Sequence, residues 1–206
     1  METDTKEMLK KILSGVSNID YVEAGDIPNI DLYMDQVTTF MDEGFASTKR
    51  YPEDKILTKT MINNYAKNNL LPPPVKKKYS KEHILAMIFI YYLKNILSIK
   101  DIETLLNPIT EKYFHDDSSF GISDIYQEIL NMEIDRIPSV QKDVAKSYKK
   151  ALEQFKDIEE LKEEELEELQ TFAFICNLSF DVYLKKQLIE QLIDELPKPQ
   201  HKKQKQ

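Results

Sequence analysis

The chain has little of what β-rich and cysteine-rich folds are built from. Its 206 residues include four glycines, one cysteine and no tryptophan. Sandwiches, barrels and nucleotide-binding folds need many tight turns, so four glycines argue against all three. The single cysteine, Cys176, excludes a disulfide framework and a thiolate metal cluster within one chain. Leucine, isoleucine, lysine and glutamate are abundant instead, so we expect an all-α protein.

Long apolar runs are also absent. No stretch approaches the roughly 20 apolar residues of a membrane span, and the first residues, METDTKEMLKK, lack the apolar core of a signal peptide. We therefore expect a cytoplasmic protein without a membrane partner. The length suffices for one large domain or two small ones with their own cores.

Positive charge is scarce overall and concentrated in one place. The formal net charge is −8, with 28 basic and 36 acidic residues. The stretch Leu57–Lys81 nevertheless contains six lysines and no acid, whereas Glu153–Glu195 contains thirteen acids and four lysines. Binding to a polyanion depends on where positive charge gathers rather than on the average. The sequence therefore indicates that Leu57–Lys81 forms a basic surface on a protein that is acidic overall.

The basic stretch begins with signals for a helix and a stiff loop. Thr58 or Thr60 can cap a helix that runs to about residue 68. Asn69 suits a left-handed residue at its end, and Leu70 and Leu71 should then enter the core. Three prolines, 72–74, hold the chain extended. Residues 75–79 follow as a short arm or β-wing.

Further helices flank this stretch. Upstream, residues 31–42 carry apolar side chains at helical spacing, and Gly44 is expected to end that helix. Downstream, Ser80 should cap an apolar helix over 81–96, which we expect to be buried and central. Ser98 with Asp101 predicts another capped helix. Asn107-Pro108 is expected to begin a new segment.

The C-terminal half predicts several separate helices. We expect a break at 136–138, a long charged helix over 139–168, and a buried or interfacial segment 171–178 that contains a buried Cys176. A last amphipathic helix, 181–196, can close the core of the monomer or form the seam of a homodimer. We favour the dimer. The basic tail, 197–206, is expected to be disordered.

The order of motifs in Leu57–Leu106 resembles the winged helix-turn-helix head of MerR-like proteins. Tyr65-Ala-Lys-Asn-Asn-Leu-Leu-Pro72 is similar to the end of their recognition helix, Tyr79-Ser80 to the pair after their wing, and Leu97-Ser-Ile-Lys-Asp-Ile102 to the start of their next helix. With the leading Asp31-Leu-Tyr-Met-Asp-Gln-Val37, the chain is most similar to an uncharacterised bacterial family, the domain of unknown function 1836.

The resemblance implies a transcriptional regulator that binds duplex DNA and is not an enzyme. It divides the chain into an N-terminal helix and linker (1–26), a MerR-like winged helix-turn-helix domain (27–107), a helical C-terminal domain that can dimerise (108–196) and the tail. The sequence itself indicates no cofactor, metal, catalytic residue or effector. The DNA-binding residues expected on this basis are Thr58, Lys59, Thr60, Asn63, Asn64, Lys67, Lys76, Lys77, Lys78 and Tyr79.

Two other functions stay open. Asn63-Asn64 stands where the MerR-like pattern has arginine and tyrosine, and arginine is a strong phosphate and guanine ligand. A protein-interaction adaptor that kept the fold without binding DNA is therefore the alternative. A remoter one is a metal-dependent hydrolase built on His115-Asp116-Asp117 with His83.

Overall fold

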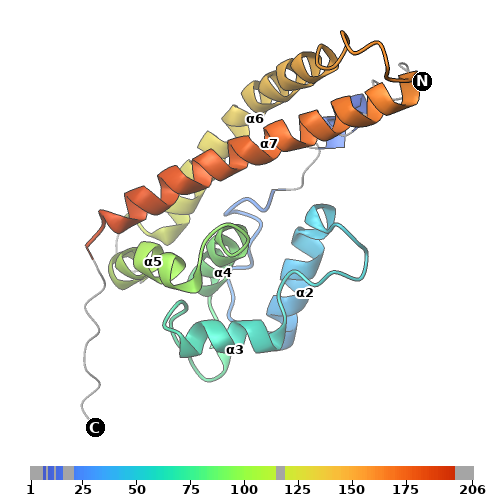
Figure 1. The fold of residues 1–206 in the computed structure, drawn as a ribbon. Coiled ribbons are helices and arrows are strands. Elements are labelled where there is room, and N and C mark those ends of the chain that lie inside the picture. Colours follow the sequence, from blue (N-terminus) through green and yellow to red (C-terminus); the bar gives the residue numbers. More distant parts are fainter. Residues whose placement is uncertain (1–6, 8, 12, 16–20, 115–118, 198–206) are drawn as a thin grey trace. The chain divides into compact units, whose positions relative to one another are not determined.

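A computed structural model describes residues 7, 9–11, 13–15, 21–114 and 119–197 of the chain, and most of these residues lie in helices (Figure 1). The all-α prediction is thus confirmed. The predicted N-terminal helix lies largely outside the described residues, as does the tail beyond Pro197. The elements, in order, are β1 (Leu32–Tyr33), α2 (Met34–Gly44), the 3-10 helix η1 (Ala46–Thr48), α3 (Lys59–Lys67), β2 (Lys78–Tyr79), α4 (Lys81–Leu93), α5 (Ile99–Tyr113), α6 (Ile122–Leu152) and α7 (Glu163–Asp194).

The chain divides into two compact units. Unit 1 falls within Met1–Met132 and Leu192–Gln206, and unit 2 is Glu133–Gln191. Unit 1 thus contains every element from β1 to α5 together with the start of α6. Unit 2 is a hairpin made of the remainder of α6 and most of α7.

The core of unit 1 is organised around α4. Six of its residues are completely or almost completely buried: Ile84, Leu85, Ala86, Met87, Ile88 and Ile90. A helix that is apolar on all sides must be covered on all sides, and Phe45, Ile62, Leu70 and Ile102 from the surrounding elements supply buried partners for this core. The prediction of a central buried helix is confirmed, although α4 ends at Leu93 rather than at 96.

The chain before α2 joins the segment after α3 in a small antiparallel sheet. Leu32 is paired with Tyr79 and Tyr33 with Lys78. Leu32 and Tyr79 are buried, whereas Tyr33 is exposed, as alternation along a strand requires. The sheet therefore ties the N-terminal side of α2 to the hairpin that follows α3.

Gly44 ends α2, as predicted, but close packing rather than a left-handed conformation explains the glycine. No glycine among the described residues has a positive φ. A Cβ atom added at Gly44 would lie 2.9 Å from Cγ2 of Val22. The connector after α2 is then held by Lys49, whose Nζ lies 2.7 Å from Oδ2 of Asp42, and this bond lowers the pKa of the Asp42 carboxyl.

The C-terminal half has fewer and longer helices than the sequence predicted. The predicted breaks at Pro108 and Pro138 are wrong, because both prolines lie inside continuous helices, α5 and α6. The predicted charged helix over 139–168 is interrupted after Leu152, and Ser179 lies within α7 rather than at a helix start. Cys176 is exposed, so its predicted burial is also wrong.

No helix in the described part of the chain combines the length and apolar character needed to cross a lipid bilayer.

Candidate nucleic-acid interface

Helix α3 turns one polar row outward. Its N-cap is Thr58, whose hydroxyl accepts a 3.2 Å hydrogen bond from the backbone N–H of Met61. Ile62 and Tyr65 are buried and fix the inner face, and burial raises the pKa of the Tyr65 phenol. The spacing of three and four residues places the opposite side chains in one row. That row is exposed and free of acids, and it consists of Lys59, Thr60, Asn63, Asn64 and Lys67.

The end of α3 is anchored as the sequence predicted. Asn69 has a φ of 56°, in the left-handed region, and the next N–H, that of Leu70, donates a 2.9 Å hydrogen bond to the carbonyl of Tyr65. Leu70 and Leu71 then enter the core with 1% exposure each. This closure satisfies carbonyl groups that a helix end leaves free and directs the chain into the proline segment.

A two-residue hairpin turn follows the prolines. The N–H of Val75 donates to the carbonyl of Lys78 at 3.1 Å, and the N–H of Lys78 donates to the carbonyl of Val75 at 2.9 Å. The two turn residues, Lys76 and Lys77, have φ of 50° and 65°, as in a type I′ turn. The predicted β-wing is thus a short hairpin whose tip consists of two exposed lysines.

The predicted contact residues fall into three groups by exposure. Most are exposed; Thr58 and Lys78 are half-buried. The Lys78 ammonium group lies 5.2 Å from the centre of the Tyr33 ring, which is a cation–π distance. Tyr79 is 3% exposed, and burial raises the pKa of its phenol. We therefore assign Tyr79 a packing role and leave it out of the contact surface.

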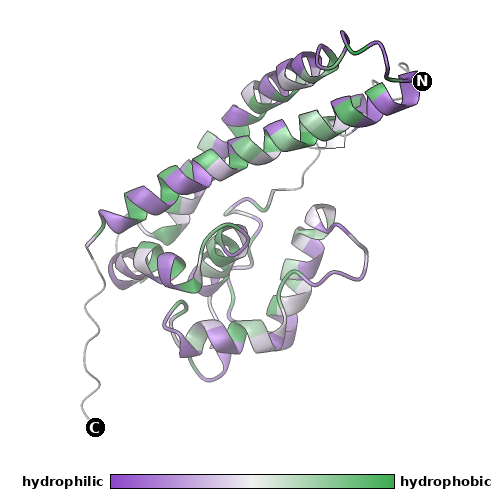
Figure 2. Cartoon of the chain, in the orientation of Figure 1, coloured by the Kyte–Doolittle hydropathy of each residue, from purple (hydrophilic) through white to green (hydrophobic). Residues whose placement is uncertain are grey.

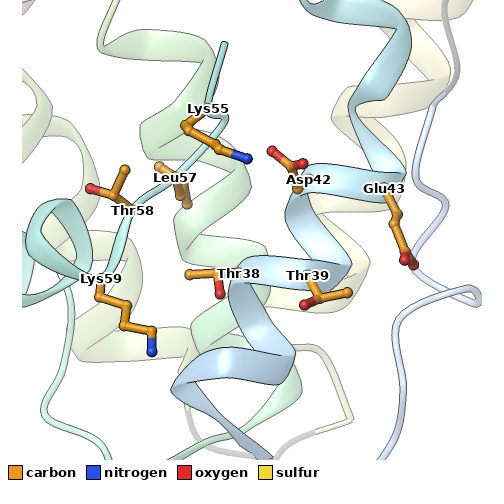
Figure 3. A pocket seen from close by; sticks show the side chains of 8 residues that line it. All are labelled: Thr38, Thr39, Asp42, Glu43, Lys55, Leu57, Thr58 and Lys59. Atoms are coloured by element: carbon orange, nitrogen blue, oxygen red, sulfur yellow. The ribbon is translucent and has the colours of Figure 1, made fainter. Parts of the chain in front are cut away.

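A hollow of about 360 Å³ lies between α2 and the start of α3 (Figure 3). Its walls carry both signs of charge, because Asp42 and Glu43 come from α2, whereas Lys55 and Lys59 come from the other side. Figure 3 shows the Lys55 ammonium directed toward the Asp42 carboxylate. Lys59 also forms an ion pair with Asp35. Acids and lysines balance here, so the hollow is a poor anion site.

A buried histidine supports the base of the hairpin. Nδ1 of His83 accepts a 3.0 Å hydrogen bond from the backbone N–H of Ser80 and lies 2.9 Å from its hydroxyl oxygen. The ring packs edge-on against Tyr79 and Phe114, with centroids 5.5 and 4.7 Å away. A neutral ring with Nδ1 as acceptor fits this arrangement, and burial lowers the pKa of His83.

His83 is therefore a capping residue, in a position where sequence analysis considered a metal ligand. Its partners in that hypothesis, His115, Asp116 and Asp117, lie outside the described residues. Among the residues that are described, no three histidine, cysteine or acidic side chains gather closely enough to hold a metal ion.

Sequence reasoning missed two parts of this region. The sequence predicts a helix from residue 31, whereas Leu32 and Tyr33 form the strand β1. It also does not predict that His83 caps α4. The capping role of His83 did have a local signal in the sequence. His83 occupies the third position after the N-cap Ser80, where a side chain can accept a hydrogen bond from the N–H of the cap residue.

Comparison with known proteins places this region in a family. The family model described as "Domain of unknown function (DUF1836)" matches residues 22–129, which is more than half of the chain. No curated protein and no solved structure matches the chain. The matched residues begin at Val22, which Gly44 approaches closely, and include β1, α2, α3, the hairpin, α4, α5 and the first turns of α6. The chain belongs to the DUF1836 family.

Proposed function

We propose that the protein is a cytoplasmic regulator of transcription that binds duplex DNA through a MerR-like winged helix-turn-helix. The observation that carries the proposal is the acid-free row on α3 together with the lysine-tipped hairpin that follows it. In this proposal α2 and α3 form the helix-turn-helix, α3 enters the major groove, and the hairpin serves as the wing.

The residue types on α3 suit base edges. Asn63 and Asn64 are adjacent and exposed, and an asparagine amide can donate and accept at the same time, as the edge of adenine requires. Lys67, one turn after them, is suited to phosphate, and Lys59, one turn before them, can reach a phosphate on giving up its ion pair with Asp35. Thr58 and Thr60 add hydroxyl groups at the helix N-terminus, where backbone N–H groups also face outward.

The hairpin suits the DNA backbone. No ion pair within the described part of the chain involves Lys67, Lys76 or Lys77. These lysines can neutralise phosphates without first losing an intramolecular partner, and each such contact releases counterions from DNA. Because the hairpin is tied to β1, its lysines have a fixed position relative to the start of α2.

The experiment is selection of bound duplexes from random DNA by the purified chain. We expect enrichment of a defined motif. The variant Asn63→Ala/Asn64→Ala should change that motif, since each lost base contact reduces discrimination by about 1–3 kcal/mol.

A second variant, Lys76→Asn/Lys77→Gly, removes two charges while retaining residues that a type I′ turn prefers. It should weaken binding to all sequences alike. The matched control, Lys100→Gln/Lys112→Gln, removes two exposed charges from α5 and should leave affinity nearly unchanged. Absence of both enrichment and a gel shift at low salt would overturn the proposal.

The second candidate function, a protein-interaction adaptor, has its own supporting observation. Tyr33, Lys78 and Val75 are register neighbours across β1, β2 and the hairpin. Tyr33 is 55% exposed and Val75 is 67% exposed. An exposed apolar pair on either side of a lysine also suits a protein partner. The failed selection described above would favour this function.

A further inference from the structure

One lysine of the proposed contact surface already has an anionic partner. Lys59, the first residue of α3, forms an ion pair with Asp35, which lies in the first turn of α2. The two side chains are 60% and 76% exposed, respectively, so a large ligand can reach both. No ion pair in the described part of the chain involves Lys67, Lys76 or Lys77. The charge of Lys59, unlike theirs, is therefore offset within the chain.

Asp35 lies between the two basic parts of the contact surface. Two residues before it, Tyr33 is paired with Lys78 of the hairpin. Asp35 itself contacts Lys59 at the start of α3. The short segment 33–35 thus contacts both the hairpin and α3. A phosphate that approaches Lys59 therefore approaches the Asp35 carboxylate as well.

The capping of α2 does not need the Asp35 carboxylate. The N-cap is Tyr33, and its backbone N–H donates a 2.9 Å hydrogen bond to Oε1 of Gln36. Asp35 contributes its backbone carbonyl, which accepts a 2.9 Å hydrogen bond from the hydroxyl of Thr38. An acid in the first turn also interacts favourably with the helix dipole, but at an exposed site this effect is small. The ion pair with Lys59 is thus the main contact that asparagine at this position would lose.

The start of α3 favours an anion from outside the helix. The N-terminal end of a helix carries partial positive charge, and Lys59 adds a full positive charge there. Hydrophilic residues lie at both ends of α3 in Figure 2, yet its first turn contains no acid. Asp35 supplies from α2 the negative charge that α3 lacks. A DNA phosphate would supply the same charge at the same place, so the two anions are alternatives.

We propose that Asp35 competes with DNA phosphate for Lys59 and thereby lowers the affinity of the protein for every duplex. The inference rests on the proposed function, since the competition matters only if α3 meets DNA. Binding exchanges the ion pair of Lys59 with Asp35 for one with phosphate, and it leaves the Asp35 carboxylate close to the negative backbone. Phosphate contacts carry no sequence information. Asp35 therefore weakens binding without changing the preferred motif.

The test compares Asp35→Asn with the wild-type chain by fluorescence anisotropy of a labelled duplex at roughly 50 mM salt. We expect the variant to bind about two- to fivefold more tightly, which is the range that an exposed ion pair contributes to an equilibrium. The gain should be equal for a selected duplex and for one of random sequence. In a Lys59→Gln background the same substitution should give a smaller gain, because the competition requires Lys59.

Two further variants serve as controls. Asp35→Glu keeps an acid that can reach Lys59, so it should retain the wild-type affinity. Glu111→Gln removes an exposed acid from α5, which carries none of the proposed contact residues, and should also leave the affinity unchanged. Urea unfolding checks that each variant is folded.

The outcomes separate this inference from the proposed function. If the wild-type chain binds duplex DNA and Asp35→Asn binds equally or more weakly, only the competition is overturned. An equal gain with and without Lys59 would also overturn it, because the acid would then act on DNA directly. If neither protein bound any duplex, the proposed function would fail and the competition with it.

Discussion

The Lys78 ammonium group lies 5.2 Å from the centre of the Tyr33 ring, across the register pair that joins β2 to β1. Tyr33, the N-cap of α2, is thereby in contact with the hairpin that follows α3. The contact is long-range in sequence and lies on the exposed face of the sheet. It gives the hairpin a fixed attachment that a free lysine-rich loop would lack.

This contact should be measurable as an interaction energy. In a double-mutant cycle with Tyr33→Leu and Lys78→Gln, we expect a coupling of about 0.5–1 kcal/mol in the free energy of unfolding, the usual value for an exposed cation–π pair. Urea unfolding of the four proteins gives the value. Strictly additive effects would mean that the two side chains do not interact.

The turn lysines should limit stability. A non-glycine residue in the left-handed region costs roughly 1–2 kcal/mol, and Lys77 has a φ of 65°. Lys77→Gly is therefore expected to raise the free energy of unfolding by about 1 kcal/mol. The control is Lys67→Gly in the last turn of α3, which should lower it by a similar amount because glycine disfavours helix. If both variants were destabilised equally, the turn would not have the described conformation.

His83 should make stability depend on pH. Burial lowers the pKa of its ring below the ordinary value of 6.5, and the carbonyls of Pro73 and Pro72 oppose this only in part. The unfolded chain therefore takes up a proton before the folded chain does, so the free energy of unfolding falls as pH drops below about 6.5. The stabilisation that comes from the neutral His83 ring is fully present above about pH 6.5.

The variant His83→Gln isolates this effect. Glutamine at the same position can still accept from the N–H of Ser80 but does not titrate. Urea unfolding between pH 5.5 and 7.5 should show a smaller dependence on pH in the variant. Its absolute stability should be lower at pH 7, since the ring contacts with Tyr79 and Phe114 are lost. An unchanged pH dependence would assign the effect to another group.

Much of unit 1 was predictable because its signals are local. The cap at Thr58, the left-handed Asn69 and the capping box of Ser98 with Asp101 all depend on residues within a few positions. The composition of Lys81–Leu93 was likewise enough to predict a buried helix. The pairing of Leu32 with Tyr79 was not predictable in this way, because it depends on where the whole unit brings two distant segments.

The C-terminal half misled sequence analysis for the opposite reason. Pro138 and Ser179 carry strong local signals for a break and a start, yet both lie within long helices. A proline removes one backbone donor and strains the helix around it, but the remaining turns on either side can outweigh this. The apolar character of 171–178 indicated burial or an interface, and Phe172 and Ile175 are in fact exposed.

The central claim is that the lysine-tipped hairpin holds DNA phosphates, and the salt dependence of binding tests it most directly. With one duplex from the selection, the logarithm of the association constant is measured against the logarithm of salt concentration for the wild-type chain and for Lys76→Asn/Lys77→Gly. We predict a slope that is shallower in the variant by about 0.9 for each lost phosphate contact, up to roughly 1.8. Two equal slopes, with affinity also unchanged, would contradict the claim.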